Sequence, residues 1–127
     1  MAEVVLDASA LLALLNREPG AESVAAVLPG AALSTLNLAE VVAKLSDGGM
    51  PGEAVREVLQ GLPVEVMPFD EEHAYKAGLL PRSAGGAALS LGDRGCLSLA
   101  QSLGLPVLTA DRSWRHLSVG VEVRLIR

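Results

Sequence analysis

Short apolar runs alternate with helix-like segments along the whole chain, and this alternation constrains the fold more than any other feature of the sequence. Strands are predicted at residues 4–6, 31–34, 64–67, 106–108 and 121–125. Helices are predicted at residues 8–16, 21–28, 36–46, 52–60, 70–80 and 93–103. Strands that alternate with helices imply a mainly parallel sheet covered on both faces. We therefore expect an α/β three-layer sandwich with about five strands, formed by residues 1–127 as a single domain.

Two segments depart from this regular pattern. In residues 121–125, apolar side chains alternate with Glu122 and Arg124, which is typical of an edge strand. Residues 82–92 are rich in glycine and show no strong periodicity. We expect this second segment to be a mobile loop.

The composition excludes several classes of protein. The only aromatic residues are Phe69, Tyr75 and Trp114, so a base-stacking platform of the kind used by single-strand binding modules is hard to build. The single Cys96 permits neither an internal disulfide nor a thiolate metal site, which favours a cytoplasmic location. No export signal and no membrane span are expected, because acids and helix breakers interrupt the apolar stretches.

Charge is unevenly distributed along the chain. Residues 1–81 contain 12 acidic and four basic side chains, whereas residues 82–127 contain three acidic side chains and six arginines. The C-terminal third is thus locally basic, although the net charge is −5. Because charges farther apart than ~8 Å are largely screened at physiological salt, this part of the chain can still attract an anion.

Four acidic side chains lie where an open parallel sheet presents its ligand site. Asp7 directly follows the first predicted strand, and Asp111 follows the fourth with two residues between. Glu40 lies about one turn into the helix after the second strand, and Asp93 is predicted to open the last helix. Because the carboxyl ends of parallel strands converge on one crevice, the four carboxylates can meet there.

Each acid also has an ordinary structural explanation. Asp7, Asp93 and Asp111 could be helix N-caps, and Glu40 could pair with Lys44 at i,i+4. Their shared location favours a common site. Two carboxylates about 4 Å apart repel by ~4 kcal/mol at an effective dielectric of about 20, so a cluster requires protonation or a cation. Oxygen ligands without cysteine or a histidine pair favour Mg²⁺ or Mn²⁺, which suits phosphodiester or phosphate-ester chemistry.

Four segments of the chain resemble the PIN-domain ribonucleases, in particular the toxins of VapBC-type toxin-antitoxin pairs. They are VVLDASALLALLNREPG at residues 4–20, STLNLAEVVAKL at 34–45, LSLGDRGCLSLA at 89–100 and LTADRSW at 108–114. The resemblance spans nearly the whole chain, in order. It implies a PIN-like fold and a Mg²⁺- or Mn²⁺-dependent endoribonuclease that leaves 5′-phosphate and 3′-hydroxyl ends.

The resemblance also implies roles for individual residues. The acidic metal site would consist of Asp7, Glu40, Asp93 and Asp111, and Ser9 and Thr109 match the polar positions that support it. Contacts with RNA phosphates are expected from the arginines that flank these acids, which are Arg82, Arg94, Arg112 and Arg115.

Partners follow from the same resemblance. They are an RNA substrate, a cognate antitoxin whose C-terminal segment lies over the acidic pocket, DNA bound only through that antitoxin, and a second copy of the chain in a homodimer. The apolar faces of residues 21–28 and 36–45 could serve as an interface, but we interpret them mostly as core.

Two other functions remain open at this point. A non-catalytic domain of the same fold could bind RNA or a protein partner, with the acids serving as caps or as a docking site for a basic partner peptide. An aspartate-nucleophile phosphohydrolase also begins with an aspartate after its first strand, but it needs a second aspartate two residues on, where this chain has Ser9.

Overall fold

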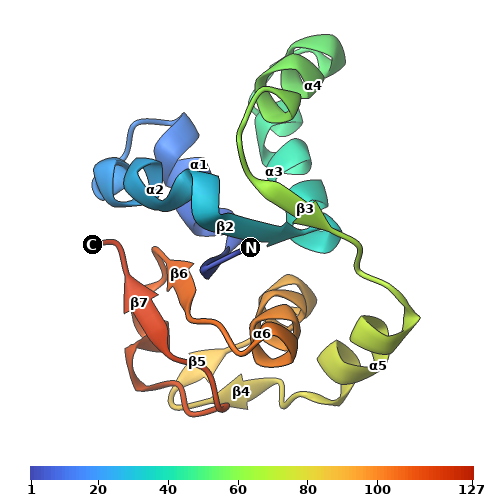
Figure 1. Ribbon diagram of the computed structural model, residues 1–127, viewed down its shortest axis with the longest axis vertical. Helices are drawn as coiled ribbons and strands as arrows, with labels where there is room; N and C mark the ends of the chain where they lie inside the picture. Colours follow the sequence, from blue (N-terminus) through green and yellow to red (C-terminus); the bar gives the residue numbers. More distant parts are fainter.

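The computed structural model describes residues 1–127 and has a parallel sheet at its centre (Figure 1). The sheet has five strands in the order β3-β2-β1-β6-β7, and every neighbouring pair is parallel. The strands are β1 (Val4–Leu6), β2 (Ala31–Ser34), β3 (Glu65–Met67), β6 (Val107–Thr109) and β7 (Val123–Leu125). The predicted parallel five-stranded sheet is therefore confirmed, with β7 at an edge.

Helices cover both faces of this sheet, as expected. They are α1 (Ala8–Leu15), α2 (Ala21–Val27), α3 (Thr35–Asp47), α4 (Gly52–Gln60), α5 (Glu71–Leu79) and α6 (Leu91–Leu103), with two short 3-10 helices, η1 (Leu28–Gly30) and η2 (Arg112–His116). Figure 1 shows α1 and α2 on one side of the sheet and α6 on the other. None of the helices combines the length and the apolar character needed to cross a membrane.

The three central strands β1, β2 and β6 are almost wholly apolar because they are buried on both sides, whereas the edge strands β3 and β7 are partly exposed. Successive side chains of β1 enter different clusters: Val4 and Leu6 pack with α1 and α2, whereas Val5 packs with α6 and the fully buried Trp114. A sheet buried on both faces leaves only its ends and edges open to ligands.

The glycine-rich segment at residues 82–92 is more structured than the sequence suggests. Strands β4 (Ser83–Ala84) and β5 (Ala87–Ala88) form a small antiparallel hairpin. Gly85 and Gly86 make its turn with φ of +54° and +84°, a conformation that glycine adopts without strain. This hairpin was not expected from the sequence, because strands of two residues are too short to show a period of two. The mobility expected of the segment stays a prediction.

Helix α6 also begins earlier than predicted. Ser90 is its N-cap and its first residue is Leu91, so Asp93 does not open the helix. Ser90 Oγ accepts a hydrogen bond from the Asp93 amide at 3.1 Å, and Asp93 Oδ2 accepts one from the Ser90 amide at 2.9 Å. This reciprocal capping box holds the Asp93 side chain at the first turn of α6.

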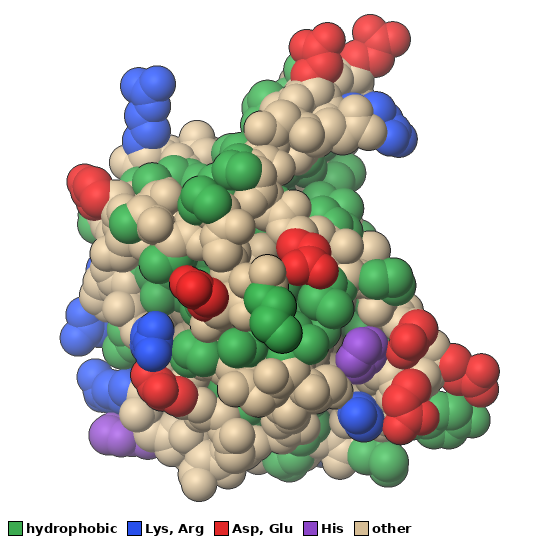
Figure 2. Space-filling model, viewed as in Figure 1, with side chains coloured by type: hydrophobic (Ala, Val, Ile, Leu, Met, Phe, Trp, Pro, Cys, Tyr) green, Lys and Arg blue, Asp and Glu red, His purple; other side chains and the backbone are tan.

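The charge asymmetry of the sequence is visible on the surface. Figure 2 shows acidic side chains gathered over α5, where Asp70, Glu71 and Glu72 begin the helix, and basic side chains along the side of the molecule that holds β7. Acidic side chains in the first turn of a helix interact favourably with the positive end of the helix dipole, so the acids at the start of α5 are explained by helix stability.

Candidate functional site

The sheet presents one natural binding crevice, at the carboxyl ends of β1 and β6. Strand order runs outward from β1 in one direction through β2 and β3, and from β6 in the other direction to β7. Ligands of open α/β sheets bind at such a switch point. Residues that immediately follow β1 and β6 therefore define the site, and these include Asp7 and Asp111.

Asp7 is held by a network of hydroxyl groups. Its backbone amide donates to Leu108 O at 3.0 Å, which places it beside Thr109 of the neighbouring strand. Asp7 Oδ2 then accepts hydrogen bonds from Ser9 Oγ at 2.6 Å and from Thr109 Oγ1 at 2.9 Å. The same hydroxyls accept from the amides of Ala110 and Asp111, at 2.9 and 3.0 Å. Ser9 and Thr109 thus fix both the Asp7 carboxylate and the backbone that leads to Asp111.

All four predicted acids line one open cavity of about 180 Å³. Its lining residues are Asp7, Ala8, Ser9, Leu12, Glu40, Lys44, Asp93 and Asp111. They come from the ends of β1 and β6, from the first turns of α1 and α6, and from the middle of α3. Residues separated by about 100 positions in the sequence therefore meet in one acidic pocket.

The electrostatics of this pocket disfavour negative charge unless a cation is bound. Asp7 is only 5% exposed, and burial, followed by the nearby charge of Asp93, raises the pKa of its carboxyl group above the usual value in spite of the Ser9 and Thr109 hydrogen bonds. Burial also raises the pKa of Glu40, and the charges of Asp7 and Asp93 act in the same direction. A divalent cation would reverse this balance.

Each remaining acid has one carboxylate oxygen engaged in a hydrogen bond. Glu40 Oε1 accepts from Asn37 Nδ2 at 2.7 Å, Asp93 Oδ2 accepts from Ser90, and Asp111 Oδ1 accepts from the amide and hydroxyl of Ser113 at 2.9 and 2.6 Å. Asp111 is therefore a helix N-cap, as its structural explanation requires, whereas the N-cap role expected for Asp93 is wrong: Ser90 is the N-cap of α6, and Asp93 completes its capping box. Capping uses one oxygen and leaves the second for a ligand.

The donor set fits a hard divalent cation. All of the acidic ligands are carboxylates, and the lining contains neither cysteine nor histidine. In the present side-chain arrangement, no three acids or histidines are close enough to hold one ion together. The four carboxylates nevertheless line one cavity.

Lys44 also lines the pocket, although the sequence suggested only that it pairs with Glu40. It lies one turn after Glu40 on α3, is exposed, and lines the acidic cavity without forming an ion pair within 4.0 Å. Its i,i+4 spacing from Glu40 was the available signal, because residues four apart share a helix face. An unpaired cation beside the acids is well placed for a phosphate group.

The four predicted arginines lie outside the cavity lining. Arg82, Arg112 and Arg115 are exposed, whereas Arg94 donates to the carbonyl of Ser90 at 3.3 Å and to that of Leu80 at 3.5 Å. Arg94 thus braces the start of α6. Contact of these arginines with RNA stays a prediction.

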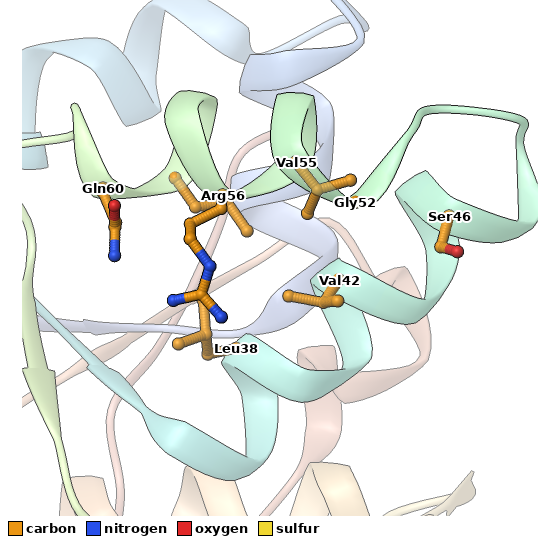
Figure 3. Close-up of a pocket in the computed structure, with 8 residues that line it drawn as sticks. Leu38, Val42, Ser46, Gly52, Val55, Arg56 and Gln60 are labelled. Carbon is orange, nitrogen blue, oxygen red and sulfur yellow. The ribbon is translucent and has the colours of Figure 1, made fainter.

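A second, larger cavity of about 260 Å³ lies between α3 and α4 and contains no acid. Figure 3 shows Leu38 and Val42 of α3 facing Val55 of α4, with the Arg56 side chain extending toward Leu38. Helix α3 therefore lines both cavities: Glu40 and Lys44 line the acidic pocket, and Leu38 and Val42 line this partly apolar groove. Val41 and Leu45 of the same helix are buried in the core, as predicted for most of the segment.

Comparison with known proteins gives one family. Residues 4–120 match the PIN domain. The fold is similar to that of a toxin-antitoxin complex from Klebsiella pneumoniae (TM-score 0.75, 19% identity, 98% of each chain covered) and of a DNA-bound VapBC from Salmonella typhimurium (TM-score 0.74, 20% identity, 100% of each chain). It is also similar to VapBC-5 from Mycobacterium tuberculosis (TM-score 0.60, 23% identity, 100% of this chain and 99% of that one). No curated protein sequence matches the chain.

Proposed function

Because the chain belongs to the PIN domain family, we propose that it is a Mg²⁺- or Mn²⁺-dependent endoribonuclease and the toxin of a toxin-antitoxin pair. The observation that carries this proposal is the single cavity lined by Asp7, Glu40, Asp93 and Asp111 at the carboxyl ends of β1 and β6. None of the four carboxylates forms an ion pair with a basic side chain, so the cavity is suited to a divalent ion. Such an ion could in turn bind a phosphodiester group.

The residues of the chain divide the work of this reaction. Asp7, Glu40, Asp93 and Asp111 would hold the ion, which when bound would supply activation of water and charge neutralisation at the scissile phosphate. Ser9 and Thr109 keep the Asp7 carboxylate in one orientation by donating to Oδ2, so Oδ1 would be available to an ion. Lys44 binds and orients a phosphate at the rim. Neither His73 nor His116 lines the pocket, so the proposal assigns no histidine general acid.

Cleavage of a labelled structured RNA tests the proposal directly. Purified protein should cut the RNA with Mn²⁺ or Mg²⁺, should fail to cut it with EDTA, and should leave 5′-phosphate and 3′-hydroxyl ends. The Asp7→Asn variant keeps the acceptors for Ser9 and Thr109 but loses the charge, and it should be inactive while folded. Cleavage that persists in EDTA or in Asp7→Asn would refute the assigned site.

We also propose an antitoxin partner, because the similar structures from Klebsiella pneumoniae and Salmonella typhimurium are toxin-antitoxin complexes, the second of them bound to DNA. In this chain DNA would be bound only through that antitoxin, in the cytoplasm, and the active form would be a homodimer. Light scattering measures the oligomeric state. Addition of the protein encoded by the adjacent gene should abolish RNA cleavage and create DNA binding, and unchanged cleavage would argue against the pair.

A non-catalytic binding domain is the second candidate. The observation in its favour is that Asp93 and Asp111 take part in helix capping and that no three acids converge tightly enough to hold one ion. A thermal shift with Mn²⁺ separates the two functions. The nuclease should be stabilised by Mn²⁺, and both Asp7→Asn and Asp93→Asn should lose that stabilisation, whereas a binding domain should show no shift.

A further inference from the structure

Glu40 is tied to the first turn of α6 through the side chain of Asn37. Asn37 Nδ2 donates to Glu40 Oε1 at 2.7 Å and to the carbonyl of Gly92 at 3.0 Å, and Asn37 is fully buried. Both partners are acceptors, so the amide can be oriented in only one way. Asn37 therefore links α3 to a segment 55 residues further along the chain.

Gly92 provides the space that the Glu40 carboxylate occupies. The nearest atoms to a Cβ built at Gly92 are the two carboxylate oxygens and Cδ of Glu40, and they overlap it. No backbone atom is among them, and Gly92 does not have a positive φ. Glycine at position 92 is therefore explained by the room that Glu40 needs. No backbone turn requires it.

The Asn37 amide is retained although it is only half satisfied. Its Oδ1 is buried without a hydrogen-bond donor, which is unfavourable for folding. The Nδ2 group of Asn37 bridges two acceptors, Glu40 Oε1 and the Gly92 carbonyl. We attribute the presence of an asparagine at this position to that bridge. It holds Oε1 of Glu40, a residue that lines the acidic pocket, and leaves Oε2 without a hydrogen bond.

We infer that Asn37 and Gly92 are positioning residues, which hold the Glu40 carboxylate beside Asp7 and Asp93 in the wall of the cavity that would take a divalent cation. This inference rests on the proposed function. It predicts that either residue affects metal binding through Glu40 alone. Loss of a partner that orients a ligand typically weakens metal binding about 10- to 100-fold.

Gly92→Ala is the sharpest test, because it should change the binding of Mn²⁺ without lowering the stability of the fold. The Glu40 side chain can swing away from the added methyl group, and alanine is the better helix former, so the variant should unfold at the same temperature as the wild type or higher. Its Mn²⁺ affinity, measured by electron paramagnetic resonance without RNA, should fall about 10- to 100-fold, and kcat should fall with it. Gly78→Ala in α5, where a Cβ meets nothing within 4 Å, is the matched control and should leave Mn²⁺ affinity unchanged.

A double-mutant cycle shows whether the effect passes through Glu40. In a Glu40→Gln background, Gly92→Ala and Asn37→Asp should cause no further loss of Mn²⁺ affinity. Wild-type affinity in the single variant Gly92→Ala, or losses that simply add to that of Glu40→Gln, would overturn the inference. A wild-type protein that neither binds Mn²⁺ nor cleaves RNA would instead overturn the proposed function, and the two failures are therefore distinguishable.

Discussion

Replacement of Thr109 by valine removes one hydroxyl group from the centre of the site and keeps the shape of the side chain. The Thr109 side chain is fully buried, donates to Asp7 Oδ2 at 2.9 Å and accepts from the Asp111 amide at 3.0 Å. A hydrogen bond to a charged group contributes about 1.5–3 kcal/mol, and an orphaned amide costs about 1–3 kcal/mol. Because Ser9 still donates to the same Asp7 oxygen at 2.6 Å, we expect a total loss of about 2.5 kcal/mol, which combines the lower ends of these two ranges.

Urea unfolding in EDTA measures this loss as a lower midpoint at an unchanged slope. Thr35→Val is the matched control, since Thr35 Oγ1 only accepts a single exposed hydrogen bond from the Phe69 amide at 2.8 Å, and it should cost about 1 kcal/mol or less. Thr109→Val should also weaken Mn²⁺ binding about tenfold or more, because Asp7 loses an orienting donor. A variant with wild-type stability and wild-type Mn²⁺ affinity would refute the assigned hydrogen-bond network.

Three further predictions concern charge and burial. Burial raises the pKa of Asp7 in the folded protein above the ordinary value of 3.8. The metal-free protein is therefore most stable below pH 3.8 with respect to this group, and it loses stability as the pH rises through the folded-state pKa. Asp7→Asn should therefore melt at a higher temperature than the wild type in EDTA near neutral pH, and the difference should shrink in acid; a variant that melts lower at neutral pH contradicts the sign. Lys44→Met should raise KM for RNA more than it lowers kcat and should reduce the slope of log affinity against log salt by about one, which binding measured at several salt concentrations checks. Burial raises the pKa of the Cys96 thiol well above its usual value, so the native protein should resist a thiol-specific reagent that labels it fully in denaturant.

The fold was predictable because its central strands are nearly continuous apolar runs. Residues 4–6 and 31–34 are buried on both sides, and such segments have a clear signature between helices of ordinary length. The hairpin around Gly85 and Gly86 was missed because two-residue strands of Ser and Ala carry no β propensity and no period. The earlier start of α6 had a readable signal, the Ser90-x-x-Asp93 pattern of a capping box.

The site was predictable as far as topology determines it. The acids that follow β1 and β6 had to share one end of the sheet, and the structure brings Asp7, Glu40, Asp93 and Asp111 to one cavity. The contacts that orient them were not predictable, because they depend on the close packing of separate helices. Gly92 reads as a flexible residue in the sequence, and only the approach of α3 to α6 shows that it makes room for Glu40.

A titration of the metal-free protein with Mn²⁺ shows whether the four-carboxylate cavity is a divalent-metal centre. Electron paramagnetic resonance reports free Mn²⁺ without RNA, antitoxin or turnover. We expect saturable binding to the wild type and loss of that binding in Asp7→Asn and in Asp93→Asn, both folded by circular dichroism. Identical Mn²⁺ isotherms for the wild type and Asp7→Asn would contradict the account.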